Sequence, residues 1–440
     1  MMVRTACLAL LACSTLAACG DDQPGDSGET GTPGETGTPG ETGTPDETGT
    51  PSDSEDQPTT GNPTADATTD PTADDTTANP TGDETTDPTG DDTTTGEPSE
   101  WDGEPLPDAD IGDWQWVDFP EAQCRNGTST GIGVRYGSGD GLVIYFEGGG
   151  ACFNAFTCGV NPDSYNAGNF TAFANGGGTQ NFFSTDAENP VGDWSFIYVP
   201  YCTGDVHAGA RPDGTLPDFA VPQQFVGYTN VAHFLERVVP TFIDGTTNVL
   251  VTGQSAGGFG AAFNYDRIAD AFPDRRVSLL DDSGPPMSDD FLAPCLQQKW
   301  RDAWNLDDTI PAECTDCFPP DGGGIVNLGT YLGQKHSDQH LALLSSLHDE
   351  TIRLFFSFGD NDCNVLFPGS VPPEVFEAGL YDLRDNHLTE PAGVWGSYFI
   401  DSSQHTWIGS NGYFNQTVDG VKLVDWVTDL VNGQTAHVSP

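Results

Sequence analysis

Short apolar runs, separated by longer mixed segments, recur along residues 101–440. Residues 141–146 (GLVIYF) and 194–200 (WSFIYVP) are nearly continuous apolar runs flanked by glycine or proline, the pattern of strands buried on both faces. Helical spacing of apolar residues predicts a helix over 230–239 and a closing amphipathic helix over 423–430. Further core strands are predicted at 248–251, 276–280, 341–346 and 394–400.

Strands that alternate with helices in this way specify a mostly parallel sheet with helices on both faces. We therefore assign residues 101–440 to the α/β class. The aromatic and acidic stretch 101–119 is predicted to be an edge element. Residues 287–335 hold tryptophans, glycines and three cysteines without a clear period, so we interpret them as a cysteine-rich insertion.

The first 100 residues have a different composition. Residues 1–19 hold one arginine and a short apolar run that ends in Leu-Ala-Ala-Cys19, which predicts a bacterial lipoprotein signal peptide with Cys19 as the lipidated residue. An ordinary signal peptide cut nearby is the alternative. Residues 20–100 lack lysine, arginine and aromatic residues and repeat GETGTP and TTDPT units. Such an acidic Thr/Pro/Gly-rich segment cannot offset its ordering entropy by apolar burial, so we expect a disordered linker.

Acidic residues dominate the charge of the chain. There are 67 Asp and Glu against 14 Lys and Arg, which gives a formal net charge of −53. A protein this acidic repels nucleic acid and anionic lipid headgroups, so neither is an expected partner. We expect contact with a membrane only through the N-terminal lipid, at the bacterial cell envelope or surface. The sequence predicts no oligomeric state.

Eight cysteines follow the linker, an even number that indicates up to four disulfides in an exported domain. Eight cysteines allow 105 pairings, so the sequence offers only the local bridge Cys152–Cys158. Cys314 and Cys317 have a zinc-like spacing, but no second ligand pair lies at the usual distance, and no metal is expected. The eight are Cys124, Cys152, Cys158, Cys202, Cys295, Cys314, Cys317 and Cys363.

Residues 248–263 (NVLVTGQSAGGFGAAF) contain the candidate nucleophile, Ser255. A predicted strand leads into G-Q-S-A-G, and a helix of small residues follows, which is the order of a nucleophile elbow. The serine needs a strained turn so that its hydroxyl stands clear of the sheet, and the flanking glycines let strand and helix pass closely. A structural turn is the alternative.

A triple-glycine loop, Gly148 to Gly150, follows the strand 141–146 directly. Its backbone N–H groups are not shielded by side chains, which suits an oxyanion hole. A further N–H would come from Ala256, directly after the candidate nucleophile. A flexible loop without such a role is the alternative.

A serine nucleophile needs a base and a carboxylate that orients the base. Six histidines follow Ser255, and His405 alone lies in a polar turn directly after a predicted terminal core strand. Three acids are candidates for the carboxylate: Asp349, Asp360 and Asp362. We favour Asp349 because it follows the strand LALLSS, where the order Ser, Asp, His along the chain requires its acid.

These pieces together resemble the pectinacetylesterase and Notum carboxylesterase family. The resemblance implies an α/β-hydrolase fold with the cysteine-rich insertion over the active site, and no cofactor. It implies a triad of Ser255, His405 and Asp349, an oxyanion hole from Gly149, Gly150 and Ala256, and the bridge Cys152–Cys158. The matching segments are FEGGGACFNAFTC (146–158), VPYCTGD (199–205), GQSAGGFGA (253–261), DDSG (281–284), ECTDCF (313–318), SSLHD (345–349) and SSQHTW (402–407).

One departure from the family concerns the loop before Cys152. Family members often carry a tryptophan there, where this chain has Gly150 and Ala151, which changes the shape expected for the acyl pocket. We expect an extracellular ester hydrolase that removes O-acyl groups, chiefly acetyl groups of a polysaccharide, or that acts on a small ester. Charge repulsion disfavours pectin itself. The alternatives are a carboxylesterase for longer acyl chains, a peptidase, and a non-catalytic surface binding module on the same fold.

Overall fold

The computed structural model describes residues 101–365 and 367–440. The predicted signal peptide (1–19), the lipidation site Cys19 and the linker (20–100) lie outside the described residues and stay predictions. None of the helices that the structure describes combines the length and the apolar character needed to cross a bilayer.

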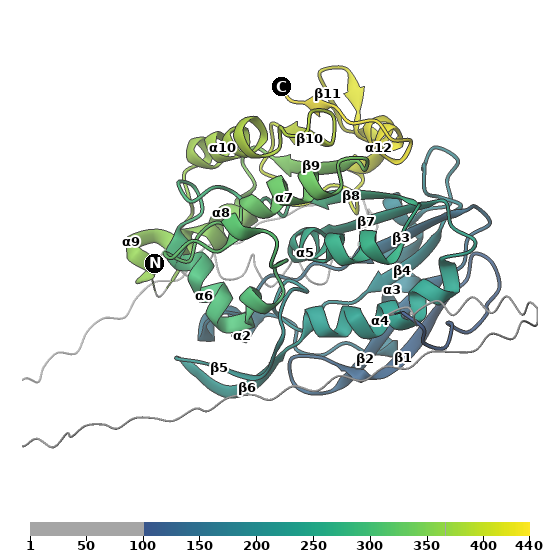
Figure 1. The fold of residues 1–440 in the computed structure, drawn as a ribbon, viewed down its shortest axis with the longest axis horizontal. Helices are drawn as coiled ribbons and strands as arrows, with labels where there is room; N and C mark the ends of the chain where they lie inside the picture. The colour runs from purple at the N-terminus through teal and green to yellow at the C-terminus, as the bar shows by residue number, and fades with distance from the viewer. Residues whose placement is uncertain (1–100, 366) are drawn as a thin grey trace, which may run out of the picture. The chain divides into compact units, whose positions relative to one another are not determined.

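A nine-stranded sheet forms the centre of the described residues (Figure 1). The edge strand β1 (Trp114–Gln123) and its neighbour β2 (Ser129–Arg135) form antiparallel pairs, and the pairs from β4 (Ser195–Val199) to β13 (His437–Val438) are parallel. The predicted mostly parallel sheet is therefore confirmed. The strand order is β1 (Trp114–Gln123), β2 (Ser129–Arg135), β4 (Ser195–Val199), β3 (Gly141–Phe146), β7 (Asn248–Gln254), β8 (Arg276–Asp282), β9 (Leu341–Ser346), β10 (Trp395–Ile400) and β13 (His437–Val438).

Both faces of the sheet are buried, because successive side chains of a strand point to opposite faces. Along β3, Leu142 and Ile144 belong to one apolar cluster, and Val143 belongs to the other. Helices α4 (Gly227–Phe242) and α5 (Ala256–Ala271) cover the first face in Figure 1. Side chains of α3 (Ala167–Ala174) and α12 (Leu423–Val431) belong to the cluster on the second face.

The parallel register brings the carboxyl ends of four strands to one edge of the sheet. Gln254 of β7 is paired with Asp282 of β8, and Asp282 with Leu344 of β9. The last residues of β9 and β10, Ser346 and Ile400, are also paired. Residues that follow these strands therefore emerge at a common edge, where open α/β sheets bind their ligands.

The segment 287–335, which we expected to be irregular, contains two helices. Helix α6 (Pro294–Trp304) buries Leu296 and Trp300, but its buried face also includes Gln297 and Arg301. Because two of the buried residues are polar, the sequence lacks a regular helical spacing of apolar residues. The Arg301 guanidinium donates to the carbonyls of a neighbouring loop, among them that of Cys317. Helix α7 (Asn327–Lys335) and the 3-10 turns Leu306–Asp308 and Thr315–Cys317 complete the segment.

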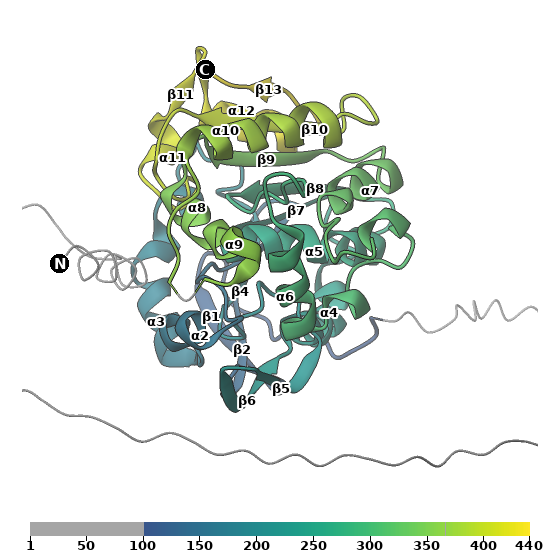
Figure 2. The same ribbon diagram turned by 90° about the vertical axis from the view of Figure 1, so that its left-hand side faces the viewer.

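Several short elements connect and cover the strands. Helices α2, α6, α8 and α9 gather on the side of the molecule that faces the viewer in Figure 2. The remaining elements are α2 (Ala155–Val160), the 3-10 turns Gly177–Thr179, Asn181–Phe183 and Ser357–Gly359, hairpin β5 (Arg211–Leu216) and β6 (Phe219–Phe225), α8 (Glu350–Phe356), α9 (Asp360–Cys363), α10 (Pro373–Asp382), the π-helix Leu383–His387, α11 (Gly412–Asn415), β11 (Thr417–Val418) and β12 (Val421–Lys422).

Four disulfides pair all eight cysteines of the described residues. Cys295–Cys363 ties helix α6 of the insertion to α9, and a bridge between Cys314 and Cys317 takes the place of the zinc ligation that their spacing suggested. The other bridges are Cys124–Cys202 and Cys152–Cys158.

Candidate active site

Ser255 occupies the sharp turn between β7 and α5. Its backbone has φ 58° and ψ −122°, a conformation that costs free energy for a residue with a side chain. The flanking glycines are required by contact distances. A Cβ at Gly257 would lie 2.0 Å from the Phe146 carbonyl oxygen, and one at Gly253 would lie 2.2 Å from the Gly257 carbonyl oxygen. The G-x-S-x-G pattern is therefore explained by steric need at both glycines.

The triple-glycine loop lies against this turn, with two of its carbonyls held by side chains. Asn161 Nδ2 donates to the Gly149 carbonyl at 2.7 Å, and the Tyr201 hydroxyl donates to the Gly150 carbonyl at 2.6 Å. In a trans peptide the carbonyl and the following N–H point in opposite directions. The N–H groups of Gly150 and Ala151 therefore point away from Asn161 and Tyr201.

Amides that can bind an oxyanion lie beside Ser255. Gly150, Ala151 and Ala256 line the same pocket as the serine. Among the described residues no acceptor is bonded to the Gly150 or Ala151 amide, and Ala256 is at the N-terminus of α5, where the first N–H groups have no intrahelical partner. Gly149 is not among the residues that line the pocket; a Cβ there would lie 2.4 Å from the Tyr201 ring.

His405 and Asp349 contact each other directly. His405 Nδ1 is 2.8 Å from Asp349 Oδ2, and the Asp349 side chain is fully buried. Asp349 Oδ1 also accepts from the backbone N–H groups of Thr351 and Ile352 at the start of α8. Because a carboxylate only accepts, His405 Nδ1 carries the proton and Nε2 is the basic nitrogen.

The structure brings Asp349, and not the other two candidate acids, to the histidine. Asp360 and Asp362 are exposed in α9. Within the described residues, the buried His405 Nε2 has no hydrogen-bond partner. A buried basic nitrogen without a partner is free to accept a proton from a substrate or a nearby hydroxyl.

Opposing effects act on the pKa of His405. Burial lowers it, but the charge and hydrogen bond of Asp349, with smaller effects of Asp282 and Glu350, outweigh burial and raise it above its ordinary value. A raised pKa means that the imidazolium formed after proton transfer is stabilised where it forms. The histidine is therefore set up to accept a proton rather than to stay neutral.

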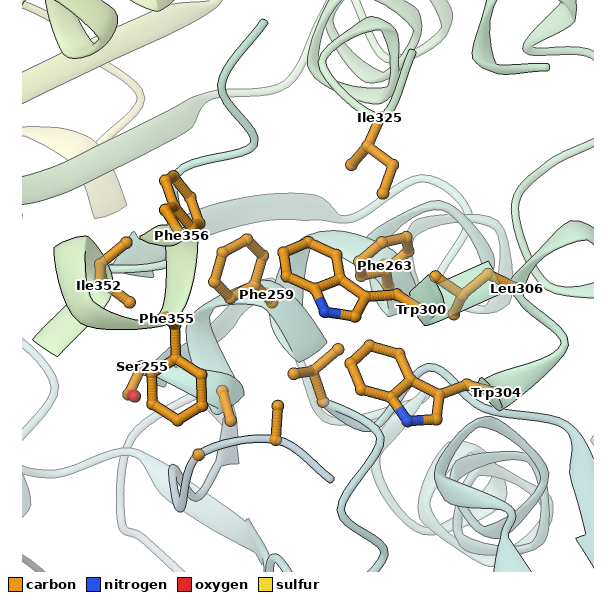
Figure 3. A pocket seen from close by; sticks show the side chains of 14 residues that line it. Ser255, Phe259, Phe263, Trp300, Trp304, Leu306, Ile325, Ile352, Phe355 and Phe356 are labelled. Carbon is orange, nitrogen blue, oxygen red and sulfur yellow. The ribbon is translucent and has the colours of Figure 1, made fainter. Parts of the chain in front are cut away.

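Ser255 lies at one end of a narrow apolar pocket (Figure 3). About 540 Å³ of empty space, part of it open solvent, lies among the lining side chains, but the centre of a water molecule fits in only about 40 Å³. The apolar lining comes mainly from α5, from the insertion and from α8: Phe259, Phe263, Trp300, Trp304, Leu306, Ile325, Ile352, Phe355 and Phe356. The expected position of the cysteine-rich insertion beside the serine agrees with this lining.

The packing of Phe355 gives a reason for glycine at position 150. Gly150 has φ +83°, and a Cβ there would lie 3.3 Å from the Phe355 ring. A tryptophan at this position would compete with Phe355 for the same space and would adopt a backbone conformation that L-residues rarely accept. The Phe355 side chain of α8 therefore lies where a side chain at position 150 would extend.

One group of potential metal ligands occurs among the described residues, away from the residues that line the serine pocket. Asp266, Asp270 and His336 present ligand atoms within 4.8 Å of one another. The Lys335 ammonium lies 2.7 Å from both carboxylates, and His336 Nε2 is 2.6 Å from Asp266. The Lys335 ammonium thus already pairs with both carboxylates of this cluster.

Sequence reasoning missed the residues that position the site. Asn161 and Tyr201 hold the glycine loop, and Asp282 is bonded to both the nucleophile turn and the histidine loop. In the sequence, Tyr201 and Asp282 stand out only as parts of the segments VPYCTGD and DDSG. Their roles depend on contacts between distant segments, which no local pattern reveals.

Residues 115–321 match the family described as Pectinacetylesterase. A palmitoleoyl-protein carboxylesterase, notum2 of Xenopus laevis, is 31% identical over 153 residues, which cover 33% of this chain and 30% of that protein. The human NOTUM protein of the same description is 27% identical over 174 residues, 37% of this chain and 34% of its own. The chain thus spans about a third of the length of these relatives.

A solved structure with the same fold is the Wnt deacylase Notum from Drosophila. The two structures superpose with a TM-score of 0.51 at 18% identity, over 72% of this chain and 92% of that one. This similarity confirms the predicted α/β-hydrolase fold. Residues 115–321, just under half of the chain, thus match the pectinacetylesterase family, and the fold agrees with that of Notum.

Proposed function

We propose that the protein is a serine carboxylic ester hydrolase with Ser255 as nucleophile, His405 as base and Asp349 as its orienting acid. The observation that carries the proposal is the buried Asp349–His405 pair, whose Nε2 has no partner among the described residues and whose loop is joined to the Ser255 turn through Asp282. The match of residues 115–321 to the Pectinacetylesterase family supports a deacylase or esterase rather than an unrelated use of the fold.

In the proposed reaction, His405 Nε2 takes the proton of Ser255 as the hydroxyl oxygen attacks the ester carbonyl carbon. The carbonyl oxygen becomes an oxyanion, which the amides of Gly150 and Ala256 stabilise, with Gly149 or Ala151 as a third donor. The alcohol leaves with the proton from His405. Water then attacks the acyl-enzyme with the same histidine as base, and the acid and free Ser255 are released. The proposed chemistry involves no cofactor.

The pocket supports an acyl chain longer than acetyl. Its lining is almost entirely apolar, and each methylene that is buried contributes about 0.8 kcal/mol, roughly a fourfold gain in binding. An acetyl group would place a single methyl group beside Ser255 and leave Trp300 and Trp304 without contact. The pocket therefore favours the carboxylesterase for longer acyl chains over the expected removal of acetyl groups, and its narrowness favours an unbranched chain.

The alcohol side of the ester faces the opening of the pocket, and we propose an acylated glycan or a small neutral ester there. A polyanionic substrate such as pectin would approach a strongly acidic protein against repulsion.

Four disulfides support export to an oxidising compartment. Lipid anchoring through Cys19 at the bacterial cell envelope is part of the same proposal and depends on the sequence alone.

A panel of substrates tests the proposal. Purified protein and the Ser255→Ala variant are assayed with 4-nitrophenyl esters from acetyl to dodecanoyl, with acetylated glycans and with peptides. We expect hydrolysis of the esters by the wild type alone, with kcat/KM rising from acetyl to a medium chain. Equal, negligible turnover by both proteins would favour the non-catalytic binding module, and cleavage of peptides in place of esters would favour a peptidase.

A further inference from the structure

Strained backbone conformations occur at the candidate nucleophile itself and directly after the candidate base. Ser255 has φ +58°, and Thr406, directly after His405, has φ +65°. Positive φ is a marked outlier for a β-branched residue such as threonine, and it persists only where the surroundings hold it. Whatever holds the turn at Thr406 therefore also sets the position of the His405 ring.

Asp282, the last residue of β8, is bonded to both strained turns. Its backbone carbonyl accepts from the Ser255 N–H at 2.8 Å. Its carboxylate oxygen Oδ2 accepts from the N–H groups of Trp407 and Ile408 at 2.7 and 2.8 Å. The side chain is fully buried, so these charge-assisted hydrogen bonds are not weakened by water.

The carboxylate itself is held in place on its other side. Ser283 Oγ donates to Asp282 Oδ1 at 3.0 Å, and Gln254, directly before the serine, presents its Nε2 to Oδ2 at 3.4 Å. Ser283 has a positive φ of 69°, which places another strained residue directly after the aspartate. Asp282 is thus the common partner of segments that come from three parts of the chain.

We propose that Asp282 is a positioning residue that fixes the His405 turn to the nucleophile elbow. The inference rests on the proposed function and adds a fourth side chain to it. Asp282 does not touch the substrate pocket or replace Asp349. It holds the imidazole through the backbone of residues 406–408, and its charge acts on the ring from a distance.

The loop that carries His405 is also held by Ser346, so its position does not depend on Asp282 alone. Ser346 Oγ donates to the Gln404 carbonyl and accepts from Trp407 Nε1, at 2.6 and 2.9 Å. The histidine loop is therefore attached to the end of β9 as well as to β8. Loss of the Asp282 carboxylate should displace the ring rather than release the loop.

The charge of Asp282 affects the pKa of His405, so a pH profile can distinguish a positioning role of Asp282 from a contribution to stability alone. The acidic groups that act on His405 are Asp349, Asp282 and Glu350, and each of them raises its pKa against the effect of burial. Burial raises the pKa of Asp282 to about 6, although the N–H groups of Ile408 and Trp407 act to lower it. Asp282 is therefore mainly ionised at neutral pH, and its neutralisation lowers the pKa of His405.

Two substitutions of Asp282 and one of its neighbour make the test. Asp282→Ala removes the acceptor and the charge, whereas Asp282→Asn removes the charge but keeps an acceptor for Trp407 and Ile408. Asp281→Asn is the matched control: burial raises the pKa of Asp281 to about 8, so it carries little charge at pH 7, and its Oδ1 accepts from Gly284 N at 2.8 Å. For each protein kcat and KM for a 4-nitrophenyl ester are measured across pH, with the thermal midpoint.

We expect Asp282→Ala to lower kcat by about 100-fold with KM nearly unchanged, the loss typical of a small displacement of a catalytic group. Asp282→Asn should retain more of kcat and move the acid limb of kcat/KM to lower pH, and Asp281→Asn should do neither. If the Ala variant fails to fold, the Asn variant alone decides. Folded Asp282 variants with wild-type kcat and an unmoved acid limb would overturn the inference, whereas an inactive wild type would overturn the proposed function instead.

Discussion

Replacement of Asp349 by asparagine should invert the hydrogen bonding of His405 while leaving the fold intact. Asp349 Oδ1 accepts from two backbone N–H groups, those of Thr351 and Ile352, both at 2.9 Å. Only the oxygen of an asparagine side chain can accept these two bonds, so its NH₂ group would face His405 Nδ1. Two donors cannot share that contact, and Nδ1 must become the acceptor. The ring proton then resides on Nε2, the nitrogen that has to take the proton from Ser255.

The magnitude follows from this tautomer change. Loss of the correct tautomer in a serine triad lowers kcat by about 10⁴-fold, whereas the helix cap at α8 is retained, so the thermal midpoint should move little. Steady-state hydrolysis of a 4-nitrophenyl ester measures kcat, and thermal unfolding of the same preparation, monitored by circular dichroism, measures the thermal midpoint. Asp360→Asn and Asp362→Asn are matched controls, since both acids are exposed on α9, and each should keep kcat within about twofold of the wild type, as surface changes usually do. A folded Asp349→Asn enzyme with a near-normal rate would refute the assignment of the acid.

Three further predictions concern pH, the glycine loop and stability. The pKa of His405 is raised above its ordinary value of 6.5, and the imidazole must be neutral to act as a base. We therefore expect kcat/KM to fall with decreasing pH through a midpoint above 6.5. A midpoint below 6.5 would contradict the assignment of His405 as the base. Tyr201→Phe removes the hydroxyl that donates to the Gly150 carbonyl. We expect kcat to fall by about 10-fold with little change in KM, a smaller effect than the loss of an oxyanion donor itself. An unchanged kcat would show that Tyr201 does not orient the glycine loop. Replacement of Cys295 and Cys363 by serine removes a disulfide that closes a loop with a sequence separation of 68. We expect the free energy of unfolding, measured in urea, to fall by up to about 4 kcal/mol. An unchanged urea midpoint would show that this disulfide adds no stability.

The sequence predicts the centre of the sheet well because its strands are buried on both faces. Runs such as GLVIYF at 141–146 contain little but apolar residues, and the structure has strand β3 over the same six residues. The elbow can also be read locally, since strand, turn and helix follow one another without interruption. The loops after β9 and β10 could be placed at the same sheet edge as Ser255 because parallel strands end together.

Other elements escaped prediction for identifiable reasons. Strand β2 (STGIGVR) contains two glycines and polar residues, and it was not predicted. The hairpin of β5 and β6 contains proline, glycine and exposed side chains, so it lacks the apolar alternation of a half-buried sheet. In helix α6 the buried Gln297 and Arg301 interrupt the apolar face. In each case a tertiary contact, and not a local preference, decides the structure.

The site shows the same division between local and long-range information. His405 and Ser255 were singled out from their positions relative to predicted strands, but three acids remained open on the sequence alone. The choice between Asp349 and the pair Asp360 and Asp362 depends on which carboxylate the folded chain buries against the imidazole. The positions of Asn161, Tyr201 and Asp282 depend in the same way on contacts between distant segments.

Covalent labelling of Ser255 is a direct test of its proposed role as a nucleophile that His405 activates. Purified protein is treated with a fluorophosphonate at neutral pH, digested, and analysed by mass spectrometry. We expect one adduct per chain on the peptide that contains Ser255, and loss of labelling in the His405→Ala variant. If the folded wild-type protein takes up no label at Ser255, or if the variant without His405 is labelled equally well, Ser255 is not a nucleophile activated by His405.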